Sequence, residues 1–391
     1  MTTTLLSDAP WRHRTGLDAL VRALDGDTGT TRFVGGAVRD TLLGLEVQDV
    51  DLATRLTPDD VLVRLAAAGI KAVPTGLAHG TITAVLEHKP YEITTLRRDV
   101  ATDGRRATVA YTGDWAEDAA RRDFTINALS ADPLSGEIFD YFGGLEDLNA
   151  GRVRFIGDPR TRIAEDHLRI LRFFRFQARF GRSDPDSVAI EACAARANDL
   201  MTLSRERIAD ELLKLLGLPD PAPSVALMTA QGIFSPVLPE IVTAEALAAL
   251  IAQEQVTQTP PASLRRLAAL LPADPARAEN IANRLKLSKA QRKHLIALAA
   301  RAAADCDAPR ALAYYEGLEV ARDRLLLGGF LLDTLEGWTP PKFPLSGRVL
   351  IAHGLMPGPQ VATTLKLIET AWVKAGFPDG PGLEALIDPA F

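Results

Sequence analysis

Hydrophobic and polar residues follow two different patterns along the chain. Up to about residue 157, short apolar runs are separated by turns rich in Gly, Asp and Pro, which favours short strands and helices joined by tight turns. From residue 158 onwards, apolar residues recur at helical spacing, as in "TRIAEDHLRILRFFRFQARFG". The pattern predicts a mixed α/β head followed by an almost wholly helical remainder.

The head divides into elements that the turn residues delimit. The segment 57–69 has Thr57 as a plausible N-cap, Pro58 at the first helical position and Gly69 at its end, so it predicts a helix. The other predicted elements are strands at 31–35 and 47–54, a short helix at 37–44, and hairpins at 80–96 and 130–142.

Composition narrows the class of protein. The chain has 391 residues, of which 47% are hydrophobic and 24% charged, as in ordinary globular proteins with two or more domains. The N-terminal stretch has no apolar core of signal-peptide length, and no run of about 18 apolar residues occurs, so we expect no membrane segment. Two cysteines form no disulfide or metal framework, which predicts a reducing cytoplasm. The net charge of −6 argues against a uniformly basic surface but allows a local basic groove.

Two aspartates lie inside a predicted strand. Asp49 and Asp51 in "VQDVDLAT" are two residues apart, so in a strand their side chains share one face. Two carboxylates so close repel each other unless a cation lies between them. Mg²⁺ would satisfy both and keep coordination sites for phosphate oxygens. The triplet "DVD" occurs widely by chance, so on its own it favours an exposed turn in which both side chains are solvated.

The residues before this strand favour the metal interpretation. Gly35 and Gly36 follow a strand and allow close approach of a ligand to the backbone, and the helix after them offers its N-terminus to an anion. Arg39, in the first turn of that helix, adds a positive charge. The pattern matches neither a P-loop nor a dinucleotide fingerprint. Together with the aspartates it indicates metal-dependent phosphoryl transfer.

Several ordered motifs resemble one known family. "GGAVRDTLLG" and "DVD", then "RRDFTINAL" (121–129) and "EDHLRILRFFRFQARFG" (165–181), resemble the class II tRNA nucleotidyltransferase (CCA-adding) and bacterial poly(A) polymerase family, from about Arg32 to Leu216. The resemblance implies an α/β nucleotidyltransferase head with a DNA polymerase beta-like mixed sheet over 1–157. It further implies an all-α neck for base recognition over 158–218, and a helical body and tail for tRNA binding over 219–391.

The resemblance also implies roles for single residues. Asp49 and Asp51 match the metal carboxylates, and Gly35, Gly36, Arg39 and Arg122 match triphosphate contacts. Glu92 matches a third acidic position, although a single carboxylate on a strand more commonly pairs with a nearby arginine. Arg172 and Arg175 match positions that reach phosphates.

Asp166 and Arg169 carry a prediction about base choice. Three residues apart on a helix, they would lie on one face, where the plainer interpretation is a salt bridge between them. Facing a base, a carboxylate accepts from an exocyclic amine and a guanidinium donates to a ring nitrogen. Cytosine and adenine offer that edge, whereas uracil and guanine do not. The resemblance assigns this recognition role to the two residues.

Positive charge is concentrated around this segment. Residues 152–182 contain nine arginines against three acidic residues, a net charge of +6 in a chain whose total is −6. A solvated helix face usually interleaves acidic residues, so the excess favours a groove for nucleotide or nucleic acid.

The sequence thus predicts a Mg²⁺-dependent enzyme that adds CMP and AMP from CTP and ATP to the 3′ end of tRNA. We expect no DNA partner. The alternatives are a poly(A) polymerase, a CC-only or A-only enzyme, and a non-catalytic RNA-binding module on a degenerate head. Between Arg97 and Asp123, the part 101–108 lacks apolar periodicity and predicts a mobile loop. In the resembled family such a loop accompanies the switch from C to A addition.

Overall fold

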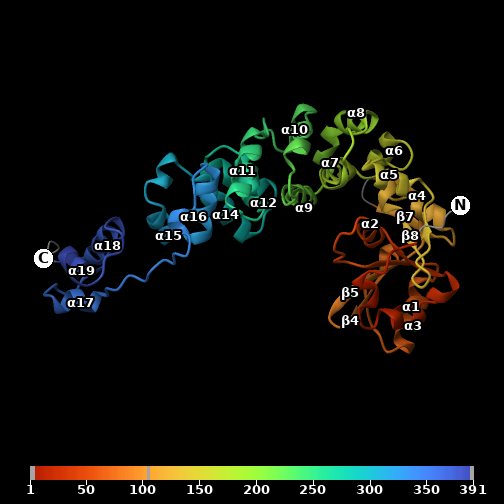
Figure 1. The fold of residues 1–391 in the computed structure, drawn as a ribbon, viewed down its shortest axis with the longest axis horizontal. Helices are drawn as coiled ribbons and strands as arrows, with labels where there is room; N and C mark the ends of the chain where they lie inside the picture. Colours follow the sequence, from red (N-terminus) through yellow and green to blue (C-terminus); the bar gives the residue numbers. More distant parts are fainter. Residues whose placement is uncertain (1–4, 104–105, 388–391) are drawn as a thin grey trace. The chain divides into compact units, whose positions relative to one another are not determined.

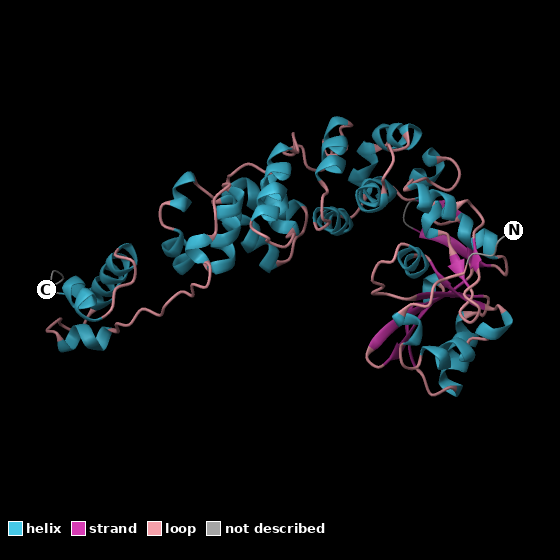
Figure 2. Cartoon of the chain, in the orientation of Figure 1, coloured by secondary structure: helices cyan, strands magenta, loops and turns pink. Residues whose placement is uncertain are grey.

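The computed structural model describes residues 5–103 and 106–387 and divides the chain into two compact units. The first unit comprises 1–203 with 230–237, and the second comprises 204–229 with 238–391. Within the described ranges the strands belong to the first unit, and helices and loops make up the rest (Figures 1 and 2). The predicted boundaries at 157 and 218 do not coincide with this division, so the three-part assignment of roles stays a prediction.

A seven-stranded mixed sheet forms the centre of the first unit. Its order is β3-β4-β5-β2-β1-β8-β9, and the β2–β5 pair is parallel whereas the other pairs are antiparallel. The strands are β1 (Thr31–Val34), β2 (Asp51–Thr54), β3 (Lys71–Gly76), β4 (Thr81–Leu86), β5 (Lys89–Thr95), β8 (Ser130–Ala131) and β9 (Ile138–Phe139).

The helices of the first unit connect or follow these strands. They are α1 (Leu17–Ala23), α2 (Gly36–Leu42), α3 (Pro58–Ala67), α4 (Trp115–Ala120), α5 (Gly144–Ala150), α6 (Pro159–Glu165), α7 (Leu168–Phe180) and α8 (Ser187–Ala195), with the 3₁₀ turn η4 (Thr125–Asn127). As predicted, Thr57 caps α3, because its side chain accepts from the Asp60 amide and Pro58 occupies the first position.

Both predicted hairpins are confirmed. β4 and β5 pair around a two-residue turn, in which Glu87 and His88 have φ of 46° and 62°. Left-handed backbone at both positions matches the twist of the flanking strands. β8 and β9 form the second, shorter hairpin.

Three predicted boundaries are wrong. The strand expected at 47–54 begins only at Asp51, so Asp49 precedes it. The helix expected to continue through residue 166 ends at Glu165, and a new helix, α7, begins at Leu168. The segment 101–108, expected as an irregular loop, belongs largely to a separate antiparallel hairpin of β6 (Arg97–Asp103) and β7 (Arg106–Tyr111). Residues 104–105, within that prediction, lie outside the described residues.

An aromatic cluster fixes α7 against the "RRDFTINAL" segment. Phe124 packs on Phe155 and Phe176, with ring centroids 4.9 and 5.0 Å apart, and Phe155 stacks on Phe173 at 5.6 Å. Phe124, Phe155 and Phe173 are fully buried, and each such side chain contributes about 1.5–3 kcal/mol by burial. The cluster therefore holds α7 beside the residues that follow α4.

The second unit is helical within the described residues. Its helices are α9 (Arg205–Leu216), α10 (Ala222–Ala230), α11 (Glu245–Val256), α12 (Ser263–Ala269), α13 (Pro275–Arg284), α14 (Lys289–Ala299), α15 (Pro309–Glu316), α16 (Leu318–Leu327), α17 (Gly347–Ala352), α18 (Pro359–Lys374) and α19 (Gly380–Ile387). A buried ionic network joins α11, α12 and α16: Glu254 accepts from Arg265 and Arg266, and Arg265 also binds Asp323 at 2.7 Å.

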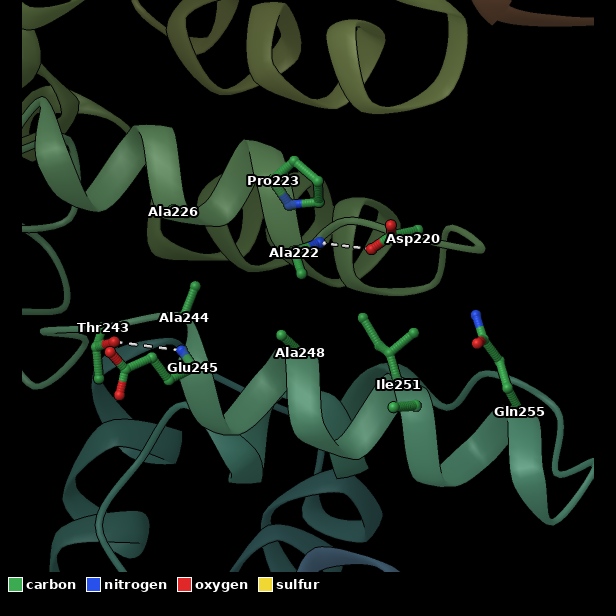
Figure 3. Close-up of a pocket in the computed structure, with 11 residues that line it drawn as sticks. Asp220, Ala222, Pro223, Ala226, Thr243, Ala244, Glu245, Ala248, Ile251 and Gln255 are labelled. Atoms are coloured by element: carbon green, nitrogen blue, oxygen red, sulfur yellow. Dashed lines mark hydrogen bonds between the residues drawn. The ribbon is translucent and has the colours of Figure 1, made fainter.

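The second unit also contains an open groove between α10 and α11 (Figure 3). Its volume is about 630 Å³, and alanines such as Ala222, Ala226 and Ala248 form much of its lining. The hydrogen bonds drawn in it lie at the starts of the two helices: Asp220 accepts from the Ala222 amide and Thr243 from the Glu245 amide. The lining, all within described residues, includes no lysine or arginine, so the groove has the wrong chemistry for a phosphate site.

None of the described helices combines the length and the apolar character needed to cross a bilayer.

Candidate active site

A cavity of about 370 Å³ in the first unit brings most of the predicted site residues together. Five arginines and three aspartates contribute to its lining, which gives it the ionic character that the groove between α10 and α11 lacks. The lining residues are Gly35, Gly36, Arg39, Asp51, Arg121, Arg122, Asp123, Asn127, Asp166, Arg169, Arg172 and Phe176. Two predicted residues, Asp49 and Arg175, do not belong to this lining.

The glycine pair forms the turn between β1 and α2. Gly35 has φ of 67° and ψ of −120°, and its amide donates to the Leu129 carbonyl at 3.0 Å. A Cβ built at Gly35 would lie 3.0 Å from Nη1 of Arg122, closer than almost any other residue could tolerate without movement of the arginine. Glycine is therefore required here both by the positive φ and by the close approach of a charged side chain.

Asp51 is the first residue of β2, and the register places it opposite Glu92 on the parallel strand β5. The two side chains consequently share one face of the sheet. Partial burial, then the charges of Glu92 and Asp49, raise the pKa of Asp51 to about 6, while Arg122 acts in the opposite direction. Asp49 lies two residues before Asp51, in the segment that leads into the strand, and its side chain is exposed. The predicted pair is therefore close in space although only one member is in the strand.

The carboxylates of Asp49, Asp51 and Glu92 are the candidate metal ligands. Across residues 5–103 and 106–387, no three His, Cys, Asp or Glu side chains are grouped as a ready metal site. Burial, and after it the negative charges of Glu92 and Asp49, raise the pKa of Asp51. A hard cation with oxygen ligands would relieve the repulsion between these carboxylates.

Arg39 is buried at the cavity wall and is held from several sides. Its guanidinium binds Asp40 at 2.7 and 2.8 Å, donates to the side-chain oxygen of Asn127, and lies 4.3 Å from the ring centroid of Phe180. Burial lowers the pKa of Arg39 despite the adjacent Asp40. The lowered pKa means that Asp40 does not fully offset the cost of burying the Arg39 charge. An anion in the cavity would therefore be attracted to Arg39.

Arg122 and Arg172 complete a cluster of positive charge. Arg122 is 3.5 Å from Asp118 and donates to the Asn127 carbonyl at 3.3 Å, and burial lowers its pKa. Arg172 binds the buried Asp123 at 2.5 and 2.7 Å. Burial alone would raise the pKa of Asp123, but Arg172 and Asn127 outweigh it and the pKa is lowered. Asp123 therefore remains an anion that orients Arg172.

Asp166 and Arg169 both line the cavity, but they are not partners on one helix. Asp166 lies in the break between α6 and α7 with φ of −151°, and its Oδ1 accepts from the Leu168 amide at 3.1 Å. Arg169 pairs with Glu165 at 2.5 Å and donates to the Arg121 carbonyl at 3.0 Å. The salt bridge of Arg169 thus joins it to Glu165, one turn earlier, and Asp166 is oriented by a backbone amide.

Arg175 differs from the other predicted phosphate contacts. It lies outside the cavity lining, and its guanidinium carbon is 4.7 Å from the ring centroid of Phe176. Its predicted contact with phosphate stays a prediction.

Four lining residues were not singled out from the sequence: Arg121, Asp123, Asn127 and Phe176. The first three belong to "RRDFTINAL", so the motif was recognised but only Arg122 was assigned. A signal existed for Asp123, because an acidic residue beside two arginines in an otherwise apolar run needs a buried partner. Asn127 and Phe176 resemble ordinary core positions in the sequence.

Comparisons with known proteins agree with this geometry. The model of the poly A polymerase head domain matches residues 31–154, and that of the probable RNA and SrmB-binding site of polymerase A matches residues 186–245. A protein named CCA tRNA nucleotidyltransferase 1, mitochondrial, from Danio rerio is 35% identical over 384 residues, which cover 93% of this chain and 88% of that protein. This chain belongs to the class II CCA-adding enzyme family. It is accordingly a nucleotidyltransferase.

Two further members of the family show how far the likeness extends. A CCA-adding enzyme from Staphylococcus epidermidis is 40% identical over 186 residues, 47% of this chain and 45% of that protein. The crystal structure of the Bacillus stearothermophilus CCA-adding enzyme in complex with CTP has a TM-score of 0.72 at 27% identity, covering 96% of this chain and 98% of that one. The predicted fold class, a nucleotidyltransferase head followed by helices, is confirmed.

Proposed function

We propose that this chain adds CMP and AMP from CTP and ATP to the 3′ end of tRNA, giving the CCA terminus. The observation that carries the proposal is the cavity in which Asp51, three anchored arginines and the Asp166–Arg169 positions converge. Membership of the CCA-adding family and likeness to an enzyme solved with CTP support the choice of substrates. The reaction is attack of the primer 3′-hydroxyl on the α-phosphate, with release of pyrophosphate.

The arginines supply the binding energy for the triphosphate. Arg39, Arg122 and Arg172 each have their guanidinium oriented by a protein acceptor, namely Asp40, the Asn127 carbonyl and Asp123. An oriented cation binds and stabilises developing phosphate charge without reorganisation during the reaction. Gly35 and Gly36 leave room for the phosphates beside these side chains.

Asp49 and Asp51 are the residues that would hold Mg²⁺, and Glu92 adjoins them. The fit rests on the carboxylates of Glu92 and Asp49, which add to burial in raising the pKa of Asp51, and on oxygen-only donors, which Mg²⁺ prefers. Bound there, the cation would lower the pKa of the attacking hydroxyl and neutralise charge on the leaving pyrophosphate.

Asp166 and Arg169 are the residues that we assign to base recognition. Asp166 contributes to the cavity lining, where a carboxylate can accept from the exocyclic amine of cytosine or adenine. The Arg169 guanidinium is held by Glu165 and the Arg121 carbonyl. A rigid pair of this kind would favour CTP and ATP over UTP and GTP.

A poly(A) polymerase is the second candidate, because the family model that matches residues 31–154 is described as a poly A polymerase head. CC-only and A-only enzymes share the same proposed chemistry. One experiment separates them all: incubate the protein and Mg²⁺ with a tRNA lacking CCA, a tRNA ending in CC, and an unrelated RNA, each with single labelled nucleotides. CCA addition requires two C on the first tRNA, one A on the second, and none on the unrelated RNA. Absence of any incorporation would favour a non-catalytic RNA-binding module.

The cytoplasm is the compartment that we propose. Both cysteines are free thiols in the structure, Cys193 buried and Cys306 exposed, which supports a reducing environment. Cell fractionation followed by immunodetection tests this assignment.

A further inference from the structure

Asn127 contacts two arginines of the cluster, Arg39 and Arg122, and the carboxylate of Asp123. Its Oδ1 accepts from Nη1 of Arg39, and its Nδ2 donates to Asp123 at 2.9 Å. Its backbone carbonyl accepts from Nη1 of Arg122 at 3.3 Å. The side chain is 7% exposed, and it also contributes to the cavity wall.

A carboxamide suits this position because the neighbours have opposite charge. On one side lies the cation Arg39, which needs an acceptor, and on the other lies the anion Asp123, which needs a donor. An aspartate could not donate to Asp123, and a buried carboxylate pair is strongly unfavourable. Asparagine satisfies both neighbours while remaining neutral itself.

The contacts of Asn127 belong to a longer circuit that begins and ends on α7. Arg172 of α7 binds Asp123, which accepts from Asn127. Asn127 accepts from Arg39, whose partner Asp40 binds Arg179, two helical turns further along α7, at 3.2 Å. Each buried polar group in the circuit therefore depends on the next for its orientation.

We propose that Asn127 is a positioning residue for nucleotide binding, which holds the Arg39 guanidinium in the orientation that receives the triphosphate. Asp40 anchors one edge of that guanidinium and Asn127 fixes the other. Without Asn127, the Arg39 guanidinium would keep its contact with Asp40 and could rotate about it. It would then be less well oriented to bind the triphosphate. This inference rests on the proposed function, because the triphosphate of CTP and ATP is the ligand that Arg39 would contact.

Asn127→Ala tests the proposal in the full-length chain. Loss of a hydrogen bond to a charged group predicts a rise in KM of roughly tenfold. The factor should be equal for CTP and ATP because both share the triphosphate, and the KM for tRNA should not change. Asn127→Ser is the second variant, because the serine hydroxyl is too short to replace the contact with Arg39. It leaves a smaller cavity than Asn127→Ala and is therefore expected to disturb folding less.

Thr125→Val is the matched control from the same 3₁₀ turn. Thr125 is fully buried and donates to Asp147 at 2.6 Å, so the variant also loses one buried hydrogen bond. Thr125 does not contribute to the cavity lining. A lower thermal midpoint with unchanged KM is expected for the control. The same result for both Asn127 variants would overturn the proposal, since Asn127 would then act on stability alone.

A double-mutant cycle with Arg39→Ala gives a readout that a purely structural role would not produce. If Asn127 acts through Arg39, adding Asn127→Ala to Arg39→Ala raises KM no further. Fully additive effects would overturn the proposal, as would an effect on one nucleotide only, which would indicate base recognition.

Inorganic triphosphate separates failure of this inference from failure of the proposed function. Calorimetric titration of triphosphate into wild type, Asn127→Ala and Thr125→Val requires no turnover. Weaker binding by Asn127→Ala alone supports the positioning role even where wild type incorporates no nucleotide, and that lack of incorporation would count against the proposed function. Equal binding by all three proteins would count against the positioning role while leaving nucleotide incorporation by wild type unaffected.

Discussion

Asp51 has an environment that few aspartates in a folded protein share. Glu92 lies opposite it across the sheet register, and the protein raises its pKa to about 6. A cation bound between these carboxylates would relieve their repulsion. The residues around Asp51 are accordingly the first to test by substitution.

We expect Asp51→Asn, and likewise Asp49→Asn, to lower kcat by about 100-fold or more, because each removes an oxygen ligand of the proposed Mg²⁺. Thermal stability and tRNA affinity should stay near wild type, since both side chains are exposed at the site and not packed in the core. Nucleotide incorporation, thermal melts and filter binding measure the three quantities. Glu92→Gln in the same assay tests a third carboxylate. Near-normal turnover of either aspartate variant with Mg²⁺ as the only cation contradicts the assignment.

Base choice is the second prediction at this scale. Asp166→Ala should weaken discrimination against UTP and GTP and slow the reaction, because a charged hydrogen bond of about 1.5–3 kcal/mol is lost. The substitution also removes the acceptor for the Leu168 amide. Asp166→Asn is the matched variant, since its oxygen keeps that acceptor while its amide can donate to a uracil or guanine carbonyl. Misincorporation measured with each nucleotide should rise most in Asp166→Asn. Uniformly slow variants with unchanged preference would show that Asp166 is structural.

At the scale of elements, residues adjacent in the sequence were sufficient to predict some turns and caps, but not every helix boundary. The Gly35–Gly36 turn and the Thr57 cap were predictable because the determining residues are adjacent in sequence. The break at Asp166 was not, because neither glycine nor proline marks it and apolar spacing continues across it. The pairings of Arg39 with Asn127 and of Arg172 with Asp123 span 88 and 49 residues. Such contacts depend on the packed fold, so the members of the site were predictable from the motifs while their partners were not.

The hairpin of β6 and β7 carries the prediction about C and A addition. Its root is tied to the main sheet, since the Leu96 amide donates to the Thr54 carbonyl at 2.8 Å and the Thr112 amide to the Leu96 carbonyl at 2.9 Å. The register shifts between Asp99 and Ala101, where the outer part begins. Replacing residues 101–108 with a short Gly/Ser bridge therefore removes the outer part and keeps the root.

We expect this replacement to leave C addition to a CCA-less tRNA largely intact and to abolish the terminal A. The physical reason is that a purine needs the Asp166–Arg169 positions to shift, and an element attached to the sheet can impose that shift. Single-nucleotide assays with CTP and ATP on matched tRNAs measure it, and alanine substitution of Thr102 and Thr108 serves as a control that preserves hairpin length. Survival of both activities, or their equal loss, would exclude the hairpin as the switch.

At the scale of the whole molecule, a net charge of −6 requires that contacts with RNA be local. The segment 219–391 was predicted to bind tRNA, and its most concentrated positive charge surrounds the start of α14, where Lys289, Arg292 and Lys293 follow the capping Ser288. Cations at a helix N-terminus oppose the helix dipole, and lysines at i and i+4 repel each other. Nearby Arg284 and Lys286 are neutralised by acidic residues at 2.6 and 2.9 Å. Within the described residues, exposed Lys289 and Lys293 make no ion pair.

If the predicted binding of tRNA by this segment holds, its phosphates would compensate the charges of Lys289 and Lys293. We therefore expect Lys289→Gln with Lys293→Gln to weaken tRNA binding uniformly across tRNA sequences. The slope of log affinity against log salt should fall by about one for each lysine that contacts a phosphate. Lys71→Gln with Lys89→Gln is the control, because it removes the same charge from exposed strand positions of the first unit. Filter binding at several salt concentrations measures both proteins. If the control lowers the slope as much as the α14 variant, the effect is one of total charge. If neither lowers it, tRNA binds elsewhere and the unpaired lysines need another explanation.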